Sequence, residues 1–367
     1  MLQKHFETIE DPRQAGKVEY NLHEIIVMTI CAVIGGAEYW EDIVDFCKAK
    51  EGWFRDRLGL KLENGIASHD TFQRIFAILR PEELERCFEN WTQSVRVKTK
   101  GEIVSIDGKS LRGSRSETHP VVHMVSAWAS HNQLVLGQVR TDAKSNEITA
   151  IPALLEMLDV SGCIVTIDAL GCQKDIARKI VDARADYVLA LKENHPDFLE
   201  DVRLYFQDIY SESKRNQDVQ RHVTKEKGHG RIETRVYCLS TGIEWLYNRA
   251  SWAGLKAIGM VHTVIHDQHK VREETRYFIT TLTNVASFSR AVRGHWGIEN
   301  SLHWVLDVIF HEDANRTRAD NSAVNFSVIR RIALNLLKAY PSSMSLRRKR
   351  FKCQIDSDFL AEVFFSS

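Results

Sequence analysis

The first hundred residues carry apolar side chains spaced by three or four positions, which is the spacing of one face of an α-helix. This pattern predicts four helices, at Leu22–Ile34, Trp40–Lys50, Ser68–Leu79 and Pro81–Val95. Ser68 is the expected N-cap of the third helix, with Asp70 in its first turn. Because no strand pattern interrupts these helices, residues 1–97 are predicted to form an amino-terminal helical domain.

After residue 97 the helical spacing gives way to short apolar runs typical of buried strands. The pattern predicts, in order, strands at Ile103–Asp107, His123–Ser130 and Gln133–Thr141, a helix at Glu147–Leu158, a strand at Cys163–Asp168, a helix at Gln173–Ala185 and a strand at Tyr187–Leu191. A helix between two strands requires a crossover, so part of the sheet must be parallel with helices on its faces. This α/β order, with a mixed sheet and flanking helices, is the ribonuclease H-like arrangement.

The region from about 197 to 285 is less regular and is interpreted as a β-rich insertion. Its strand-like runs are Arg231–Leu239, Leu255–Ile265 and Tyr277–Leu282. The segment from Lys214 to Arg235 is locally basic, which fits either a solvated loop or a surface that contacts phosphates.

The region after the insertion is again helical. Helices are predicted at about Ser287–Ile309 and Ala323–Ala339, before the basic run Arg347–Lys352. We therefore expect one α/β domain over residues 98–345 and a basic carboxy-terminal tail over residues 346–367.

Composition narrows the function less than the pattern does. Lys+Arg and Asp+Glu both number 49, so net charge gives no indication of nucleic-acid binding. The seven cysteines include no Cys-x-x-Cys pair, which fits a reduced cytoplasmic location and disfavours a zinc knuckle. No export signal is visible, and the apolar run from Ile25 to Gly36 is shorter than the roughly 20 residues that span a bilayer. No membrane association is expected.

Three carboxylates stand where a ligand site is expected. Asp107 and Asp168 each end an apolar strand, and ligands of open α/β sheets collect beyond the carboxyl ends of parallel strands. A single strand-end Asp is usually a turn residue, but two on separate strands of one domain suggest a site. Glu299 lies beside the core-facing stripe of its helix, which is formed by Ile298, Leu302, Val305 and Ile309. Three such oxygen ligands suit Mg²⁺ and two-metal phosphoryl transfer, with Asp107 as the bridging ligand.

A zinc site is the rival interpretation of the same helix. His295, Glu299, His303 and Asp307 recur every four residues along one flank. Four such positions extend over about 18 Å of helix, so they cannot all reach one tetrahedral ion. Their histidines are then expected to be core groups or groups that support the carboxylate site.

At these residues the chain resembles a known family. The segments Ser105–Arg112, Thr166–Ala169 and Arg293–Asp307 resemble the H-repeat-associated bacterial insertion-sequence transposases of the DDE type. Pro12-Arg13 and Ser68–Arg74 resemble the helical domain that accompanies these catalytic cores. That domain is expected to be either a DNA-recognition module or a bundle that braces the catalytic domain.

The resemblance implies a ribonuclease H-like catalytic domain with a β-rich insertion and a DDE triad of Asp107, Asp168 and Glu299. It implies Mg²⁺ as cofactor, with Mn²⁺ as a possible substitute, and cleavage and joining of double-stranded DNA at element terminal repeats and target DNA. Self-association in the DNA complex is implied in the same way. The non-enzyme alternative is a domesticated DNA-binding protein that has lost strand transfer, and retention of all three carboxylates argues against it.

The sequence identifies the residues that contact DNA phosphates less clearly than it identifies the three carboxylates. Related transposases have Tyr and Arg before the catalytic Glu and Lys after it, whereas Val292, His295 and Leu306 stand at those positions here. The candidates for phosphate contacts are Lys109, Lys192, Arg231, Arg293, His295, His303 and Arg316.

Overall fold

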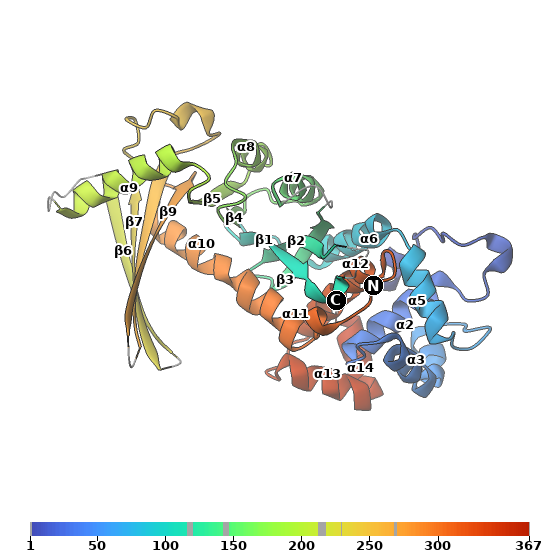
Figure 1. Cartoon of the computed structure of the whole chain (residues 1–367). Coiled ribbons are helices and arrows are strands. Elements are labelled where there is room, and N and C mark those ends of the chain that lie inside the picture. Colours follow the sequence, from blue (N-terminus) through green and yellow to red (C-terminus); the bar gives the residue numbers. More distant parts are fainter. Residues whose placement is uncertain are drawn as a thin grey trace. The chain divides into compact units, whose positions relative to one another are not determined.

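The chain has a mixed α/β fold that divides into two compact units (Figure 1). The computed structural model describes residues 2–115, 120–141, 147–211, 218–228, 230–267 and 270–366. One unit, here the helical unit, comprises Met1–Val97, Gly108–Ser145 and Glu299–Ser367. The other, the sheet unit, comprises Lys98–Asp107 and Asn146–Ile298. This division differs from the expected boundaries at 98 and 345, because the helices after residue 299 pack against the amino-terminal helices.

The helical unit is built around one buried helix. Its helices are α1 (Leu2–Phe6), α2 (Leu22–Ile34), α3 (Trp40–Ala49), α4 (Glu51–Leu58), α5 (His69–Ile78), α6 (Pro81–Val95), α11 (Trp304–Val308), α12 (Ser322–Ala339), α13 (Leu346–Ile355) and α14 (Ser357–Phe365). Helix α12 packs against α2, α5, α6, α13 and α14, and nearly all of its side chains are buried. The four predicted amino-terminal helices are confirmed, and Ser68 caps α5 by accepting a hydrogen bond from the Thr71 amide.

Polar side chains on α12 attach it to its neighbours. The Asn325 side-chain amide donates to the carbonyl oxygens of Phe76 and Leu79, which terminate α5. Asn335 exchanges two hydrogen bonds of 2.9 Å with the backbone of Val135 in β3 (Leu134–Arg140). Buried amides with partners fix the direction of packing, because leaving them unpaired would cost more than the bonds contribute. The amino-terminal helices therefore brace a common core with α12.

The carboxy-terminal residues 346–367, which were expected to form a basic tail, include two packed helices. Lys349 donates two hydrogen bonds of 2.7 Å to the carbonyl oxygens of Leu337 and Tyr340 at the end of α12. The buried Arg350 donates to the Val33 carbonyl oxygen in α2. Two of the basic residues therefore donate hydrogen bonds to backbone carbonyl oxygens at the carboxyl ends of helices, where cations are favoured by the helix dipole.

The sheet unit contains a mixed sheet, as predicted. Its strand order is β1 (Ile103–Leu111, with residues 103–107 in this unit), β4 (Ile164–Ile167), β5 (Asp186–Leu191), β9 (Val271–Thr280), β8 (Ala257–His266), β7 (Arg231–Ser240) and β6 (Val219–Gly228). The pairs β1–β4 and β4–β5 are parallel, and the remaining pairs are antiparallel. The predicted insertion therefore continues the sheet through the β5–β9 pair. In the helical unit, β2 (Val122–Ala129) pairs antiparallel with β3.

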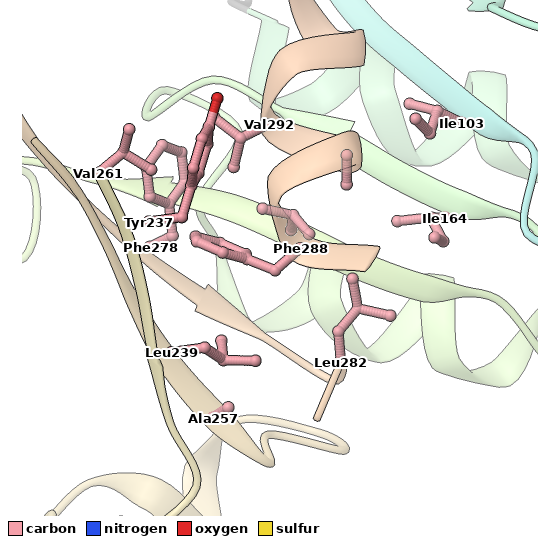
Figure 2. Packing of buried hydrophobic residues seen from close by; sticks show 12 residues of the cluster. Ile103, Ile164, Tyr237, Leu239, Ala257, Val261, Phe278, Leu282, Phe288 and Val292 are labelled. Carbon is pink, nitrogen blue, oxygen red and sulfur yellow. The ribbon is translucent and has the colours of Figure 1, made fainter. Parts of the chain in front are cut away.

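Helix α10 (Val285–Ile298) packs against the sheet through the aromatic side chain of Phe288 (Figure 2). Phe288 is fully buried and meets Phe278 edge-on, with ring centroids 5.6 Å apart. Gly259 in β8 provides the space, because a Cβ atom there would overlap the Phe288 ring. The other helices of this unit are α7 (Glu147–Met157), α8 (Lys174–Asp182) and α9 (Pro196–Ser211). This packing fixes the path of α10 toward the ends of the parallel strands.

A buried acidic pair on α6 makes stability dependent on pH. Burial raises the pKa of Glu85 to about 8, with repulsion from Glu89 adding to it, and burial raises the pKa of Glu89 to about 7. Because the pKa values of both carboxyls are higher in the folded state than in the unfolded state, the fold is favoured while they are neutral. That stability is fully present below the unfolded pKa of 4.5 and is lost as pH rises through 7 and 8.

We therefore expect Glu85→Gln to stabilise the chain above pH 8 by on the order of 3 kcal/mol, because the amide carries no charge to desolvate. Urea unfolding between pH 6 and pH 9 measures the difference. Glu41→Gln, at an exposed position in the first turn of α3, is the matched control. Parallel stability profiles for wild type and Glu85→Gln would contradict the expectation.

Candidate active site

Two of the three predicted acids start from neighbouring backbone positions. The parallel pairing of β1 and β4 ends with Ile106 opposite Ile167, so Asp107 and Asp168 are the next residues on adjacent strands. Adjacent strands lie about 4.8 Å apart. Both aspartates are partly exposed, whereas the residues before them are buried. Two like charges at one sheet edge repel each other, and a bound divalent cation removes that repulsion.

The turn after β4 holds the carboxylate of Asp168. Its Oδ1 accepts hydrogen bonds from the amides of Leu170, at 3.0 Å, and Gly171, at 3.4 Å. A side chain at position 171 would overlap Ile167 and Ile151, so the turn requires glycine for its close approach. The oxygen Oδ2 takes part in neither bond. Asp168 therefore has a structural role through one oxygen, and the other oxygen suits a ligand role.

Hydroxyl groups connect the strand ends to the end of α10. Thr166 Oγ1 lies 3.1 Å from Ser105 Oγ and 2.9 Å from His295 Nδ1. Burial lowers the pKa of His295 to about 4, against the opposing effect of Asp168. The imidazole is therefore neutral at neutral pH, which suits a hydrogen-bonded positioning group better than a phosphate-binding cation. The sequence indicated neither Ser105 nor Thr166, because buried hydroxyls in a strand have no distinctive pattern.

Glu299 stands at a break in the predicted long helix. The expected helix Ser287–Ile309 consists of α10, a π-helical segment η4 (Glu299–His303) and α11. Short π-helical segments are rare and frequently occur at functional sites. Glu299 is exposed, and the neighbouring stripe residues Ile298 and Leu302 are fully buried. Glu299 begins a stretch of the helical unit, whereas both aspartates belong to the sheet unit, and its convergence with them stays a prediction.

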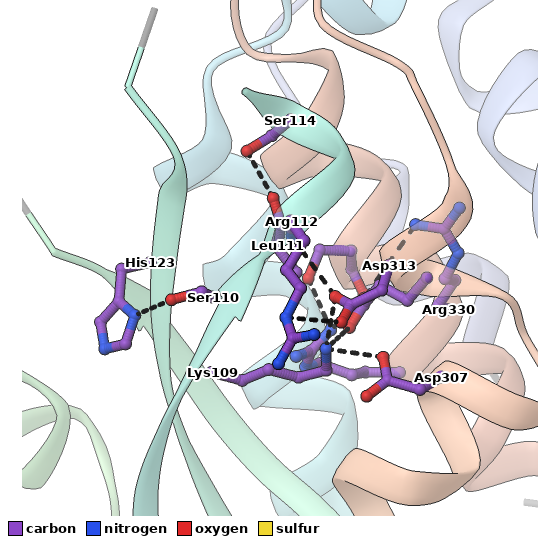
Figure 3. Close-up of polar contacts among 12 residues, drawn as sticks. Lys109, Ser110, Leu111, Arg112, Ser114, His123, Asp307, Asp313 and Arg330 are labelled. Atoms are coloured by element: carbon purple, nitrogen blue, oxygen red, sulfur yellow. Dashed lines mark hydrogen bonds and ion pairs between the residues drawn. The ribbon is translucent and has the colours of Figure 1, made fainter. Parts of the chain in front are cut away.

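Lys109 is surrounded by carboxylates of the helical unit (Figure 3). It is only 7% exposed, and its Nζ lies 2.6 Å from Asp307 Oδ1 and 2.8 Å from Asp313 Oδ1. Burial raises the pKa of Asp307, and Lys109 opposes that shift. Asp313 also accepts a hydrogen bond of 3.3 Å from the Arg112 amide. The Lys109 ammonium, expected to contact DNA phosphate, is thus paired with acids of its own chain.

A second acid in this region is neutralised by arginines. Glu312 is buried, with Arg331 Nη1 2.9 Å and Arg330 Nη1 4.0 Å from its Oε1. Although burial alone would raise the pKa of Glu312, Arg331 and Arg330 together hold it below its usual value. This ionic cluster fixes the segment between α11 and α12.

The other basic candidates have different surroundings. Lys192, just past β5, and Arg316, before α12, are exposed. Arg231 forms an ion pair of 2.6 Å with Glu233, and Arg293 forms one of 3.2 Å with Glu226. His303 lies in the π-helical segment and is partly buried. Lys192 and Arg316 are therefore the candidates best placed to meet a phosphate.

The described part of the chain has no grouping of three His, Cys, Asp or Glu side chains that could hold a metal ion. For the zinc interpretation, η4 interrupts the regular spacing of His295, Glu299, His303 and Asp307. His295 is bonded to Thr166, and Asp307 is paired with Lys109. Within the same described ranges, no helix is both long and apolar enough to span a membrane.

Comparisons with known proteins agree with the resemblance. The family described as "Transposase DDE domain" matches residues 98–336, and the family described as "DDE_Tnp_1-associated" matches residues 3–92. The chain is 39% identical to "H repeat-associated putative transposase YhhI" of Escherichia coli K12, over 100% of this chain and 98% of that protein. It is 40% identical to "Putative transposase YncI" of Escherichia coli O157:H7, over 99% of this chain and 94% of that protein.

Two further matches are partial or distant. A segment covering 20% of this chain is 46% identical to "Inactive transposase YbfQ" of Escherichia coli K12, covering 86% of that protein. A solved piggyBac transposase synaptic complex with hairpin DNA has a TM-score of 0.43 and 11% identity, covering 98% of this chain and 80% of that one.

Proposed function

Because the chain belongs to the H-repeat-associated DDE transposases, we propose that it cleaves and joins DNA strands at the ends of an insertion sequence in a metal-dependent reaction. The observation that carries the proposal is the register of β1 and β4, which makes Asp107 and Asp168 neighbours at the carboxyl edge of two parallel strands. The domain that carries both aspartates is proposed to be ribonuclease H-like, and the parallel β1–β4–β5 order supports this proposal.

The donor set fits Mg²⁺, with Mn²⁺ as a substitute. Asp107 and Asp168 supply hard carboxylate oxygens from a rigid edge, and Asp168 Oδ1 is already held by two amides. Glu299 is proposed as the third ligand, which requires the helical unit to present it to the aspartates. When bound, two such ions would activate the attacking water or 3′-hydroxyl and stabilise the leaving oxygen.

The residues of the chain itself would bind and orient the DNA. Lys192 and Arg316, which are exposed, are the proposed phosphate contacts, and Arg231, Arg293 and His303 are second candidates. His295 is proposed to position the end of α10 through Thr166, because its neutral ring offers no charge to a phosphate. Double-stranded terminal repeats and target DNA are the proposed partners, and self-association would bring two ends together.

The test uses the full chain and a duplex carrying the inverted repeats that flank its gene. We expect strand nicking and joining in Mg²⁺ or Mn²⁺, products with 3′-hydroxyl ends, and no reaction in EDTA. A relative named inactive keeps one alternative relevant, namely a DNA-binding protein without strand transfer. Tight binding of this duplex with no cleavage in either metal would favour that alternative and overturn the proposal.

A further inference from the structure

A buried ion pair joins the strand that carries Asp107 to the helical run that begins at Glu299. Lys109 lies two residues beyond Asp107 on β1, and Asp307 lies eight residues beyond Glu299. The Lys109 ammonium is within 2.8 Å of both Asp307 Oδ1 and Asp313 Oδ1 (Figure 3). These contacts all lie within the helical unit. Residues about 200 positions apart in sequence are thereby held together within the helical unit.

The chemistry of this contact suits positioning better than it suits stability alone. Burying a lysine costs desolvation energy, and a well-packed apolar side chain at the same place is often as stabilising. A multiply paired ammonium, in contrast, fixes distances, because its attraction falls off as either carboxylate moves away. Asp307 and Asp313 come from consecutive segments, α11 and η5 (Glu312–Ala314), so the contact fixes both.

The π-helical segment makes such a restraint necessary. Glu299 is the first residue of η4, which inserts a wider turn between α10 and α11. Helices often kink at π-helical turns, so the orientation of Glu299 depends on what anchors the helix after it. Lys109 anchors α11 at Asp307, four residues after the end of this turn.

We propose that Lys109 is a positioning residue that holds the Glu299 helical run against β1 through Asp307 and Asp313, and so sets the place of the third carboxylate. This inference rests on the proposed function, because it assigns Glu299 a ligand role. Removing a group that orients a metal ligand typically costs about 10–100-fold in metal affinity.

The test compares Lys109→Met, which keeps the length of the side chain and removes its charge, with Lys98→Met as a matched control. Lys98 forms a similar ion pair of 2.6 Å with Asp159, but at an exposed position. Mn²⁺ binding by the full chain with the terminal-repeat duplex is followed from the EPR signal of free Mn²⁺. We expect Lys109→Met to weaken binding about 10–100-fold and Lys98→Met to leave it unchanged.

Hydrogen exchange provides the second measurement. In Lys109→Met we expect at least about tenfold faster exchange of amides in residues 299–308, with unchanged exchange in β7 and β8. Asp307→Asn should give the same pattern, and the double variant should be no worse than either single one. Unchanged exchange at 299–308, or faster exchange with wild-type Mn²⁺ binding, would overturn the positioning role.

The two proposals fail in different ways. A wild-type chain that binds Mn²⁺ but leaves the duplex uncut would contradict the proposed function. Comparing Mn²⁺ binding by Lys109→Met with that of wild type would then still test the positioning role of Lys109. Normal Mn²⁺ binding by Lys109→Met, in a chain that cleaves DNA, would contradict the positioning role and leave the proposed function intact.

Discussion

Asp168→Asn is expected to reduce metal-dependent DNA cleavage by at least about 10³-fold while leaving the fold intact. The asparagine side-chain oxygen can still accept the amides of Leu170 and Gly171, so the turn after β4 is preserved. What the substitution removes is the negative charge that a divalent ion requires from this edge of the sheet. Rates of nicking in Mg²⁺ and thermal unfolding of the same samples measure the two effects separately.

Asp175→Asn is the control for this experiment. Asp175 is an exposed acid in the first turn of α8, seven residues from Asp168, so its removal changes net charge equally. We expect cleavage close to the wild-type rate. Asp107→Asn and Glu299→Gln should match Asp168→Asn, because the three acids would act as one unit. Cleavage by Asp168→Asn within tenfold of wild type would exclude Asp168 as a ligand.

The edge that carries the two aspartates was predictable from sequence because it depends on local pattern. The runs ending at Asp107 and Asp168 are almost continuously apolar, which is typical of parallel strands buried on both faces. Strand-end carboxylates on neighbouring parallel strands must then share one edge. The observed register of Ile106 with Ile167 is the consequence.

Elements without a local apolar pattern were not predicted. Strand β6 is almost wholly exposed, with the sequence Val-Gln-Arg-His-Val-Thr-Lys-Glu-Lys-Gly, so no alternation indicated a strand. Its ten pairs with β7 provide the stabilisation that its own side chains do not. The π-helical turn at Glu299 was also missed, because a pattern of 3.6 residues tolerates one extra residue without an obvious break.

The surroundings of Lys109 could not be deduced for a different reason. A lysine after a strand-end aspartate looks locally like a phosphate contact, and its partners lie about 200 residues further along the chain. Pairing over that separation depends on how α11 and η5 pack in the helical unit, and no periodicity encodes it. The same holds for Arg331 and Glu312, whose arrangement depends on the burial of α12.

Glu312→Gln is expected to lower the free energy of unfolding by about 3–5 kcal/mol, the usual cost of breaking a buried ion pair. The change leaves Arg331, which is fully buried, without the carboxylate 2.9 Å away. Glu51→Gln, which breaks the exposed Glu51–Arg55 pair of 2.8 Å, is the control and should cost less than about 1 kcal/mol in urea unfolding.

The sign of the pH dependence adds a second criterion. Because the pKa of Glu312 is lowered in the folded state, its contribution is present above the unfolded value of 4.5 and is lost as pH falls further. The stability difference between wild type and Glu312→Gln should therefore shrink below pH 4.5, and a difference that stays constant there would mean that this carboxylate carries no buried charge.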